Sequence, residues 1–337
     1  ERQALWLAGW LQRYPCLRGE SDAPALKESD LAHSVLARWP GPLGRDAVPA
    51  MPAGVRGVVL NLPGAEPRWQ AMAAQLDRLG WTGSHGRFEA QSASLEEARA
   101  LGLKGAGELG LWRTTTGLLD EWLAEDLAPD ALLHVIEDDA VLHPALPLIF
   151  EPLRSHRPPL DLLFSEAFLS RDLFRRFCAM EHQRQQQGEG LWLLNPGQYL
   201  ACTSSYVLTA QGARRLRKAM EGREQSGSLV PLDMFLRELL RRGELSGSLT
   251  LPFFSTVAPE VSTGIQAYRD QAVRLAQDAD LCLRRWLYLQ AWNPEAGRAV
   301  VQELSGVLAN GLPLDQLAML MPDVLDEGRR RGWLQEY

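Results

Sequence analysis

Apolar positions fall into short runs that alternate with longer amphipathic stretches through the middle of the chain. Compact apolar runs predict buried strands at 55–62, 131–136, 160–165, 198–208 and 248–254. Helical spacing predicts helices at 68–79, 94–101, 108–123, 209–220 and 231–242, and a polar helix and loop at 172–190. Strands that alternate with helices favour an α/β sheet with parallel character.

Several helix ends carry recognisable signals. Ser94 is followed three residues later by Glu97, the capping-box pattern, and Thr209 is the expected N-cap of the helix at 209–220. Gly80 stands where a helix beginning near Arg68 should stop. These signals support the element boundaries independently of the apolar pattern.

The two ends of the chain differ from its middle. Helical patterns at 2–14 and 25–38 precede a linker rich in proline and glycine, and further helical patterns cover 269–292, 294–310 and 323–333. We therefore expect an N-terminal helical extension with its linker at 1–54, an α/β domain at 55–268 and a C-terminal helical region at 269–337.

Composition narrows the class of protein. With 337 residues, 46% of them hydrophobic and 23% charged, the chain is typical of a soluble globular protein. A net charge of -7 argues against nucleic-acid binding, which usually needs a concentrated basic face. The scattered cysteines indicate reduced thiols, and no apolar stretch is long enough to span a membrane. We expect a cytoplasmic protein.

The apolar run 131–136 ends abruptly in Glu137-Asp138-Asp139. Adjacent carboxylates repel one another, and a cation such as Mn²⁺ or Mg²⁺ would offset that repulsion and bind a diphosphate. Alternate strand residues face the same way, so Asp139 first and Glu137 second are the expected metal ligands, while Asp138 faces the other side unless the strand has already ended. The alternative is a solvated acidic turn.

Six short motifs follow one another in order: VVLNL at 58–62, LGW at 79–81, GELG at 107–110, IEDDA at 136–140, SYVLTAQGA at 205–213 and PLDMFL at 231–236. From about Val55 to Gln266 they resemble glycosyltransferase family 25, which includes lipooligosaccharide and collagen galactosyltransferases. The resemblance departs at 111–116, where the family has Ser-His, and at 262–265, where a late aspartate is missing.

This resemblance implies a GT-A type, Rossmann-like fold and metal-assisted, inverting transfer of a hexose, galactose or glucose, from a uridine-diphosphate sugar. The acceptor would be a hydroxyl of a glycan, lipid or protein. The resemblance assigns donor contacts to Asn61, Arg68, Glu108 and Asp138. A basic cluster at 214–218 would suit an anionic acceptor and peripheral membrane association, or is a solvated helix face.

Asp233 is the candidate catalytic base, because a helix start keeps a carboxylate ionised and an inverting transfer needs a proton acceptor. The alternative is a helix-start acid without a chemical role. Glu108 has a similar alternative as a capping residue, and Arg68 as a surface arginine. We expect His134 to be a core histidine and His143 a turn histidine rather than metal ligands.

Two other function classes compete with the transferase. One is a non-catalytic binding or scaffolding protein that keeps the transferase shell. The other is a phosphoryl-transfer enzyme, which ranks low because the sequence has neither a GxxxxGK[ST] loop nor kinase signatures.

Overall fold

The computed structural model describes residues 27–41, 43, 49–169, 171–258, 284, 287, 288, 291 and 292. The chain divides into two compact units. One comprises Glu28–Phe168 and Gln187–Tyr268; the other comprises Glu1–Lys27, Leu169–Gln186 and Arg269–Tyr337. The predicted helices at 2–14, 269–292, 294–310 and 323–333 lie outside the described residues, apart from isolated positions. The three-part division therefore stays a prediction.

An eight-stranded mixed sheet forms the first unit, with strand order β1-β7-β9-β6-β8-β4-β2-β3. Its strands are β1 (Val35–Pro40), β2 (Val55–Asn61), β3 (His85–Glu89), β4 (Leu132–Glu137), β6 (Leu162–Phe164), β7 (Glu189–Leu194), β8 (Ser205–Thr209) and β9 (Gly247–Leu251). A separate antiparallel pair joins β5 (Ala140–Leu142) to β10 (Ser255–Val257). The α/β prediction is confirmed in this general form.

Parallel pairing is confined to part of the sheet. β2 lies between β3 and β4 and is parallel to both, and β6 is parallel to β9. The remaining neighbours, including β4 with β8, are antiparallel. Because β2 and β4 run the same way, their carboxyl ends meet at one edge, where the acidic residues follow β4.

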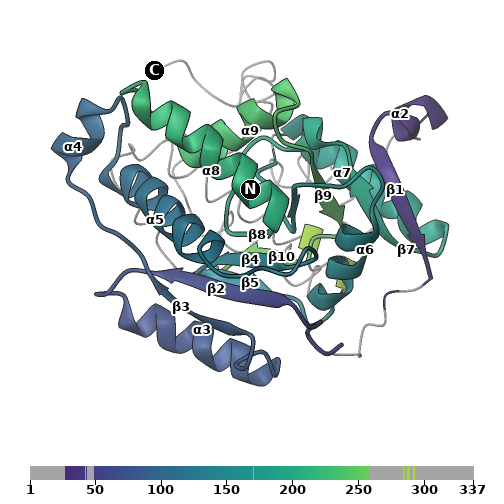
Figure 1. Ribbon diagram of the computed structural model, residues 1–337. Helices are drawn as coiled ribbons and strands as arrows, with labels where there is room; N and C mark the ends of the chain where they lie inside the picture. Colours follow the sequence, from purple (N-terminus) through teal and green to yellow (C-terminus); the bar gives the residue numbers. More distant parts are fainter. Residues whose placement is uncertain are drawn as a thin grey trace, which may run out of the picture. The chain divides into compact units, whose positions relative to one another are not determined.

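Helices cover both faces of the parallel part. Figure 1 shows α3 (Glu66–Arg78) on one side of β2 and β3, with α5 (Ala106–Leu123) and α8 (Ala210–Gln225) side by side on the other. The indole of Trp112 on α5 donates to Glu224 of α8 at 3.0 Å, which ties the two helices together. The other helices are α2 (Glu28–Ala32), α4 (Leu95–Ala100), α6 (Phe150–Ser155), α7 (Arg171–Gln186) and α9 (Leu232–Arg242), with short 3-10 turns η2 (Leu146–Ile149) and η3 (Pro196–Gln198).

The predicted helix-end signals are confirmed. Ser94 and Glu97 form a complete capping box at α4, and the hydroxyl of Thr209 accepts the Gly212 N–H at 3.0 Å at the start of α8. Gly80 follows α3 with a φ of 70°, a conformation that costs glycine little.

The predicted helix at 25–38 is wrong beyond its first turns. α2 ends at Ala32 and the chain continues as β1, which pairs antiparallel with β7. The guanidinium of Arg38 lies 4.9 Å from the ring of Trp192 in β7. Pairing with a strand more than 150 residues away in the sequence overrides a local helical pattern, because propensity is a weak prior against tertiary contacts.

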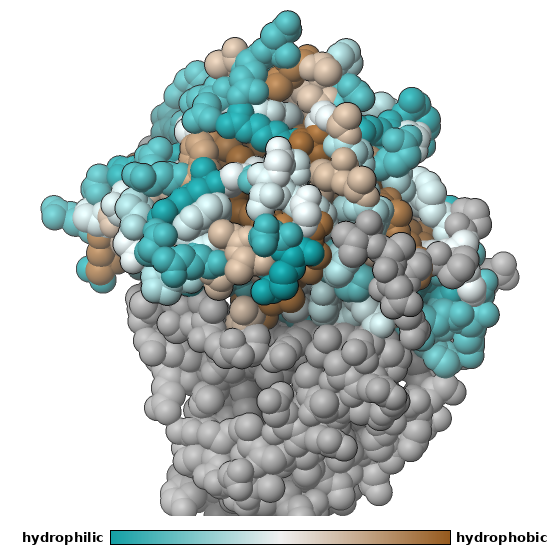
Figure 2. All heavy atoms as spheres, turned by 90° about the horizontal axis from the view of Figure 1, so that it is seen from below, coloured by the Kyte–Doolittle hydropathy of each residue, from teal (hydrophilic) through white to brown (hydrophobic). Residues whose placement is uncertain are grey.

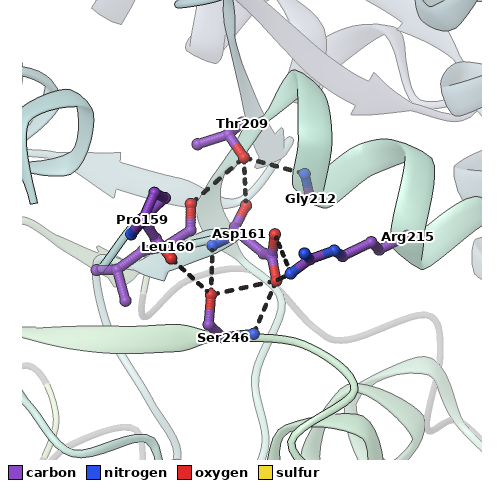
Figure 3. Close-up of polar contacts among 7 residues, drawn as sticks. All are labelled: Pro159, Leu160, Asp161, Thr209, Gly212, Arg215 and Ser246. Atoms are coloured by element: carbon purple, nitrogen blue, oxygen red, sulfur yellow. Dashed lines mark hydrogen bonds and ion pairs between the residues drawn. The ribbon is translucent and has the colours of Figure 1, made fainter. Parts of the chain in front are cut away.

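A buried carboxylate joins three elements at the edge of the sheet opposite the acidic end of β4. Asp161 accepts the Ser246 N–H at 2.8 Å and the Arg215 guanidinium at 2.9 Å, and its backbone carbonyl accepts the Thr209 hydroxyl at 3.3 Å (Figure 3). Asp161 precedes β6, Ser246 precedes β9, and Arg215 belongs to α8. This network fixes the edge opposite the acidic end of β4.

The core contains several fully buried aromatic side chains, among them Trp81, Trp112, Trp122 and Trp192. The large hydrophobic residues that are exposed come from separate elements: Leu36, Leu62, Leu95, Leu148 and Met234. On the face shown in Figure 2, hydrophilic and hydrophobic residues are interspersed over the described part. Among the described residues, no helix is both long and apolar enough to cross a membrane.

Candidate functional site

The acidic residues lie at the point where β4 leaves the sheet. Glu137 is the last residue of β4, and Asp138 and Asp139 form the turn into β5. The Thr203 hydroxyl donates to the Glu137 carboxylate at 2.7 Å, and the Glu137 N–H donates to the Ser204 carbonyl at 2.8 Å. The segment before β8 therefore holds Glu137 in place.

Asp138 is held from the β2 side. The Asn61 side-chain amide donates to Asp138 at 2.5 Å and to the Ala65 carbonyl at 3.2 Å. The Arg68 guanidinium lies 3.1 Å from the other Asp138 oxygen. Three residues that the sequence analysis assigned to a donor site are thus brought together by β2, α3 and the turn after β4.

Among the residues that the structure describes, one oxygen of Asp139, Oδ1, is buried and has no hydrogen-bond partner, and the same is true of the Asn61 Oδ1 atom. Burial is the largest cause that raises the pKa of Glu137 and of Asp139, and repulsion from neighbouring carboxylates raises both pKa values further. An unpaired buried carboxylate oxygen is costly, so this site favours a bound cation or hydrogen-bond donor.

All three carboxylates line one cavity of about 280 Å³. Its other walls are Arg68, the loop Ala90–Ala93 that follows β3, and the start of α5 at Ala106, Gly107 and Gly110. Asp138 lines the cavity together with its neighbours because the strand has already ended at Glu137 and the chain turns, which is the alternative that the sequence left open.

The cavity wall depends on a close approach between α5 and the loop after β3. A Cβ on Gly110 would lie 2.6 Å from the Gln91 carbonyl oxygen, a contact that real Cβ atoms do not make. The Gln91 N–H also donates to the Thr114 hydroxyl at 2.8 Å. The sequence did not identify four residues as parts of this site: Gly110, Gln91, Thr114 and Thr203. Only Gly110, a glycine within a predicted helix, is unusual enough in the sequence to indicate a close contact.

Glu108 is buried and its carboxylate accepts the N–H groups of Lys104 at 2.9 Å and Gly105 at 3.2 Å. This is the capping role that the sequence offered as the alternative to donor binding. The donor contact itself stays a prediction.

Asp233 lies in the first turn of α9, where its carboxylate accepts the Met234 N–H at 2.7 Å. Burial is the largest cause that raises its pKa, while hydrogen bonds from the Met234 and Cys202 backbones lower it. Cys202 has a φ of 96°, unusual for a residue with a side chain, and adjoins the Thr203 that holds Glu137. Asp233 is therefore connected to the acidic cluster through this segment.

The two histidines near the triplet behave as expected. His134 is fully buried in β4, with its ring nitrogens hydrogen-bonded to His85 and Ser205. His143 accepts the Ala145 N–H at 3.0 Å and so stabilises the turn before η2. Over the ranges that the structure describes, no three His, Cys, Asp or Glu side chains are arranged as a complete metal-binding group.

Comparison with known proteins gives limited similarity. No protein-family model matches the chain. Curated relatives include the "Probable protein kinase UbiB" proteins of three Vibrio cholerae serotype O1 strains (ATCC 39541, M66-2 and ATCC 39315), each 29% identical over 109 residues. The match covers 31% of this chain and 18% of each relative.

These findings contradict the predicted membership of glycosyltransferase family 25. The predicted activity, hexose transfer to a glycan, lipid or protein acceptor, is contradicted with it, since the similarity found is to a probable protein kinase. The scaffolding alternative gains no support either. The name of these relatives is that of a protein kinase, and kinases carry out phosphoryl transfer. The sequence ranked this chemistry low because it has no kinase signatures.

Proposed function

We propose that this chain binds the phosphate groups of a nucleotide through a divalent cation, Mn²⁺ or Mg²⁺, in the cavity at the carboxyl ends of β2 and β4. The observation that carries the proposal is the buried, unpaired Asp139 oxygen beside two further carboxylates and Arg68 in one cavity. In open α/β sheets, ligands bind at this end of the strands.

The residues present fit such a cation. Mg²⁺ is usually held by one or two carboxylates, with nucleotide phosphates and water completing its octahedron, so a ready-made group of three protein ligands is not required. Asp139 and Glu137 would hold the cation, which would neutralise phosphate charge. Asp138 stays paired with Asn61 and Arg68.

Two features of the cavity suit a phosphate. The guanidinium of Arg68 lies at its edge, and the first N–H groups of α5, at Ala106 and Gly107, belong to residues that line it. A helix N-terminus carries partial positive charge and free N–H donors, which favour anions. The Rossmann-like, GT-A type arrangement predicted from the sequence belongs to this proposal, supported by the parallel order β3-β2-β4.

Phosphoryl transfer is the activity that we propose for the site. Kinases bind a nucleotide through divalent cations and use a carboxylate to accept the proton of the attacking hydroxyl. Asp233 is the residue that we assign to that proton, because it is held against the segment that positions Glu137. The proposal includes a cytoplasmic location, which the scattered cysteines of the sequence favour.

The test is calorimetric titration of the purified chain with ATP, ADP, UTP and a uridine-diphosphate sugar, each in Mg²⁺, Mn²⁺ and EDTA. We expect at least one nucleotide to bind with metal and to lose binding in EDTA. Incubation with γ-labelled ATP and metal then measures phosphate release or transfer. Absence of metal-dependent binding by every nucleotide would refute the proposal; binding without turnover would refute only the phosphoryl-transfer step.

A further inference from the structure

A row of four hydrogen-bonded side chains crosses one face of the sheet from β3 to β8. The Ser84 hydroxyl lies 2.9 Å from Nδ1 of His85, Nε2 of His85 lies 3.0 Å from Nδ1 of His134, and Nε2 of His134 lies 3.0 Å from the Ser205 hydroxyl. His134 is fully buried and His85 nearly so. The proposed nucleotide site uses neither histidine.

This row of side chains can cross β2 only because β2 has a glycine at the crossing point. β2 lies between β3 and β4, and Gly57 pairs with His85 on one side and His134 on the other. A Cβ on Gly57 would lie 1.9 Å from Cδ2 of His85, inside the space that the imidazole ring occupies. The ring of His85 therefore spans β2 and joins the two strands that flank it.

Two proton arrangements satisfy the row, one the reverse of the other. In one of them the Ser84 hydroxyl donates to the Trp81 carbonyl at 3.0 Å and accepts the proton on Nδ1 of His85. Nε2 of a neutral His85 then accepts the Nδ1 proton of His134, and Nε2 of His134 accepts from Ser205.

Solvent reaches one end of the row. Ser84 and His85 line a cavity of about 590 Å³, open at the β3 edge, whose ionisable lining groups are Arg56, Arg87, Glu89 and Glu121. The rings of Trp81 and Phe150 pack against the two histidines from the other sides, at centroid distances of 5.6 and 5.8 Å. Burial is the largest cause that lowers the pKa of each histidine, for His85 to about 4.

We propose that His85 and His134 are positioning residues that hold β4 to β3 across Gly57, and that loss of their hydrogen bond weakens the nucleotide site. β4 ends in the carboxylates that line the proposed site, so loss of its lateral support displaces them. This inference rests on the proposed function, since its principal readout is nucleotide affinity.

The experiment compares affinity for the Mg²⁺–nucleotide complex at pH 7 in wild type, His85→Gln and His85→Ala. Glutamine keeps a hydrogen-bonding group for His134, whereas alanine removes it. We expect His85→Ala to bind the nucleotide several-fold more weakly than His85→Gln; equal affinity of these two variants would overturn the proposal.

Gly57→Ala tests the geometry at neutral pH. Its Cβ must displace the His85 ring, and the loss of support from about one hydrogen bond should weaken nucleotide binding by up to about fivefold. Gly86→Ala, on the neighbouring strand, is the control, because its Cβ would meet no atom within 4 Å. Equal affinity of the two variants would contradict the proposal.

Nitrogen-15 spectra of the histidine rings in the nucleotide-free protein give a readout independent of binding. We expect both rings to be neutral at pH 6, with the proton on Nδ1 of both or on Nε2 of both. A protonated His85 at pH 6 would overturn the inference. If wild type binds no nucleotide at pH 7 while the spectra show this neutral pair, the proposed function fails and the His85–His134 geometry survives.

Discussion

Replacing Asp161 by alanine removes the acceptor at the centre of the network shown in Figure 3. The Ser246 N–H, bonded at 2.8 Å, loses its partner, and the Ser246 hydroxyl loses a contact of 3.2 Å. An unsatisfied buried donor costs about 1–3 kcal/mol and a lost neutral hydrogen bond about 1 kcal/mol. Because the Arg215 side chain is 50% exposed, water replaces its ion pair, which adds little.

We therefore expect Asp161→Ala to lower the free energy of unfolding by about 2–4 kcal/mol and Arg215→Ala by no more than about 1 kcal/mol. Urea denaturation followed by circular dichroism measures both, with unchanged m-values as evidence that the unfolded states are comparable. If Arg215→Ala costs as much as Asp161→Ala, the ion pair rather than the Ser246 contacts stabilises this edge, and the reasoning fails.

Three further outcomes are expected. The pKa of His85 is lowered to about 4 in the folded protein, so between the ordinary histidine pKa and pH 4 the unfolded chain binds a proton that the folded chain does not. Urea denaturation should therefore give a free energy of unfolding about 2 kcal/mol lower at pH 5 than at pH 7 from this group. An unchanged free energy of unfolding between these pH values would contradict this. Gly110→Ala should push α5 away from the Gln91 carbonyl and weaken nucleotide binding in calorimetry, whereas an unchanged affinity would show that the wall tolerates the shift. Arg68→Gln should weaken binding of a triphosphate more than that of a nucleoside, and an equal loss for both would exclude a phosphate contact.

Sequence patterns predicted the elements whose signals are local. β2 and β4 are compact apolar runs, α5 has a clear helical period, and α4 has its capping box. β3 was not predicted because its sequence, HGRFE, is that of a polar edge strand without an apolar run. β1 was predicted as helix because its own residues do not show that it pairs with β7.

The candidate site was predictable where one segment carries it. The end of the strand at Glu137 can be read from the sequence, because an apolar run stops there at three acidic residues. Asn61 and Arg68 lie beside Asp138, as the order of the elements suggested. The Thr203 contact and the approach of Gln91 to Gly110 depend on tertiary packing, which no local pattern encodes. The family resemblance failed because short motifs around strand ends and helix starts recur among α/β proteins with different functions.

Electron paramagnetic resonance of Mn²⁺ tests most directly whether a cation and a nucleotide bind together at the end of β4. Free Mn²⁺ is titrated with wild type, Asp139→Asn and the exposed-site control Asp126→Asn, each with and without ADP. We predict that ADP strengthens Mn²⁺ binding to wild type and to the control, and that Asp139→Asn loses this effect while its circular dichroism spectrum is unchanged. Equal ADP-dependent binding of Mn²⁺ by all three proteins would contradict a cation site at Asp139.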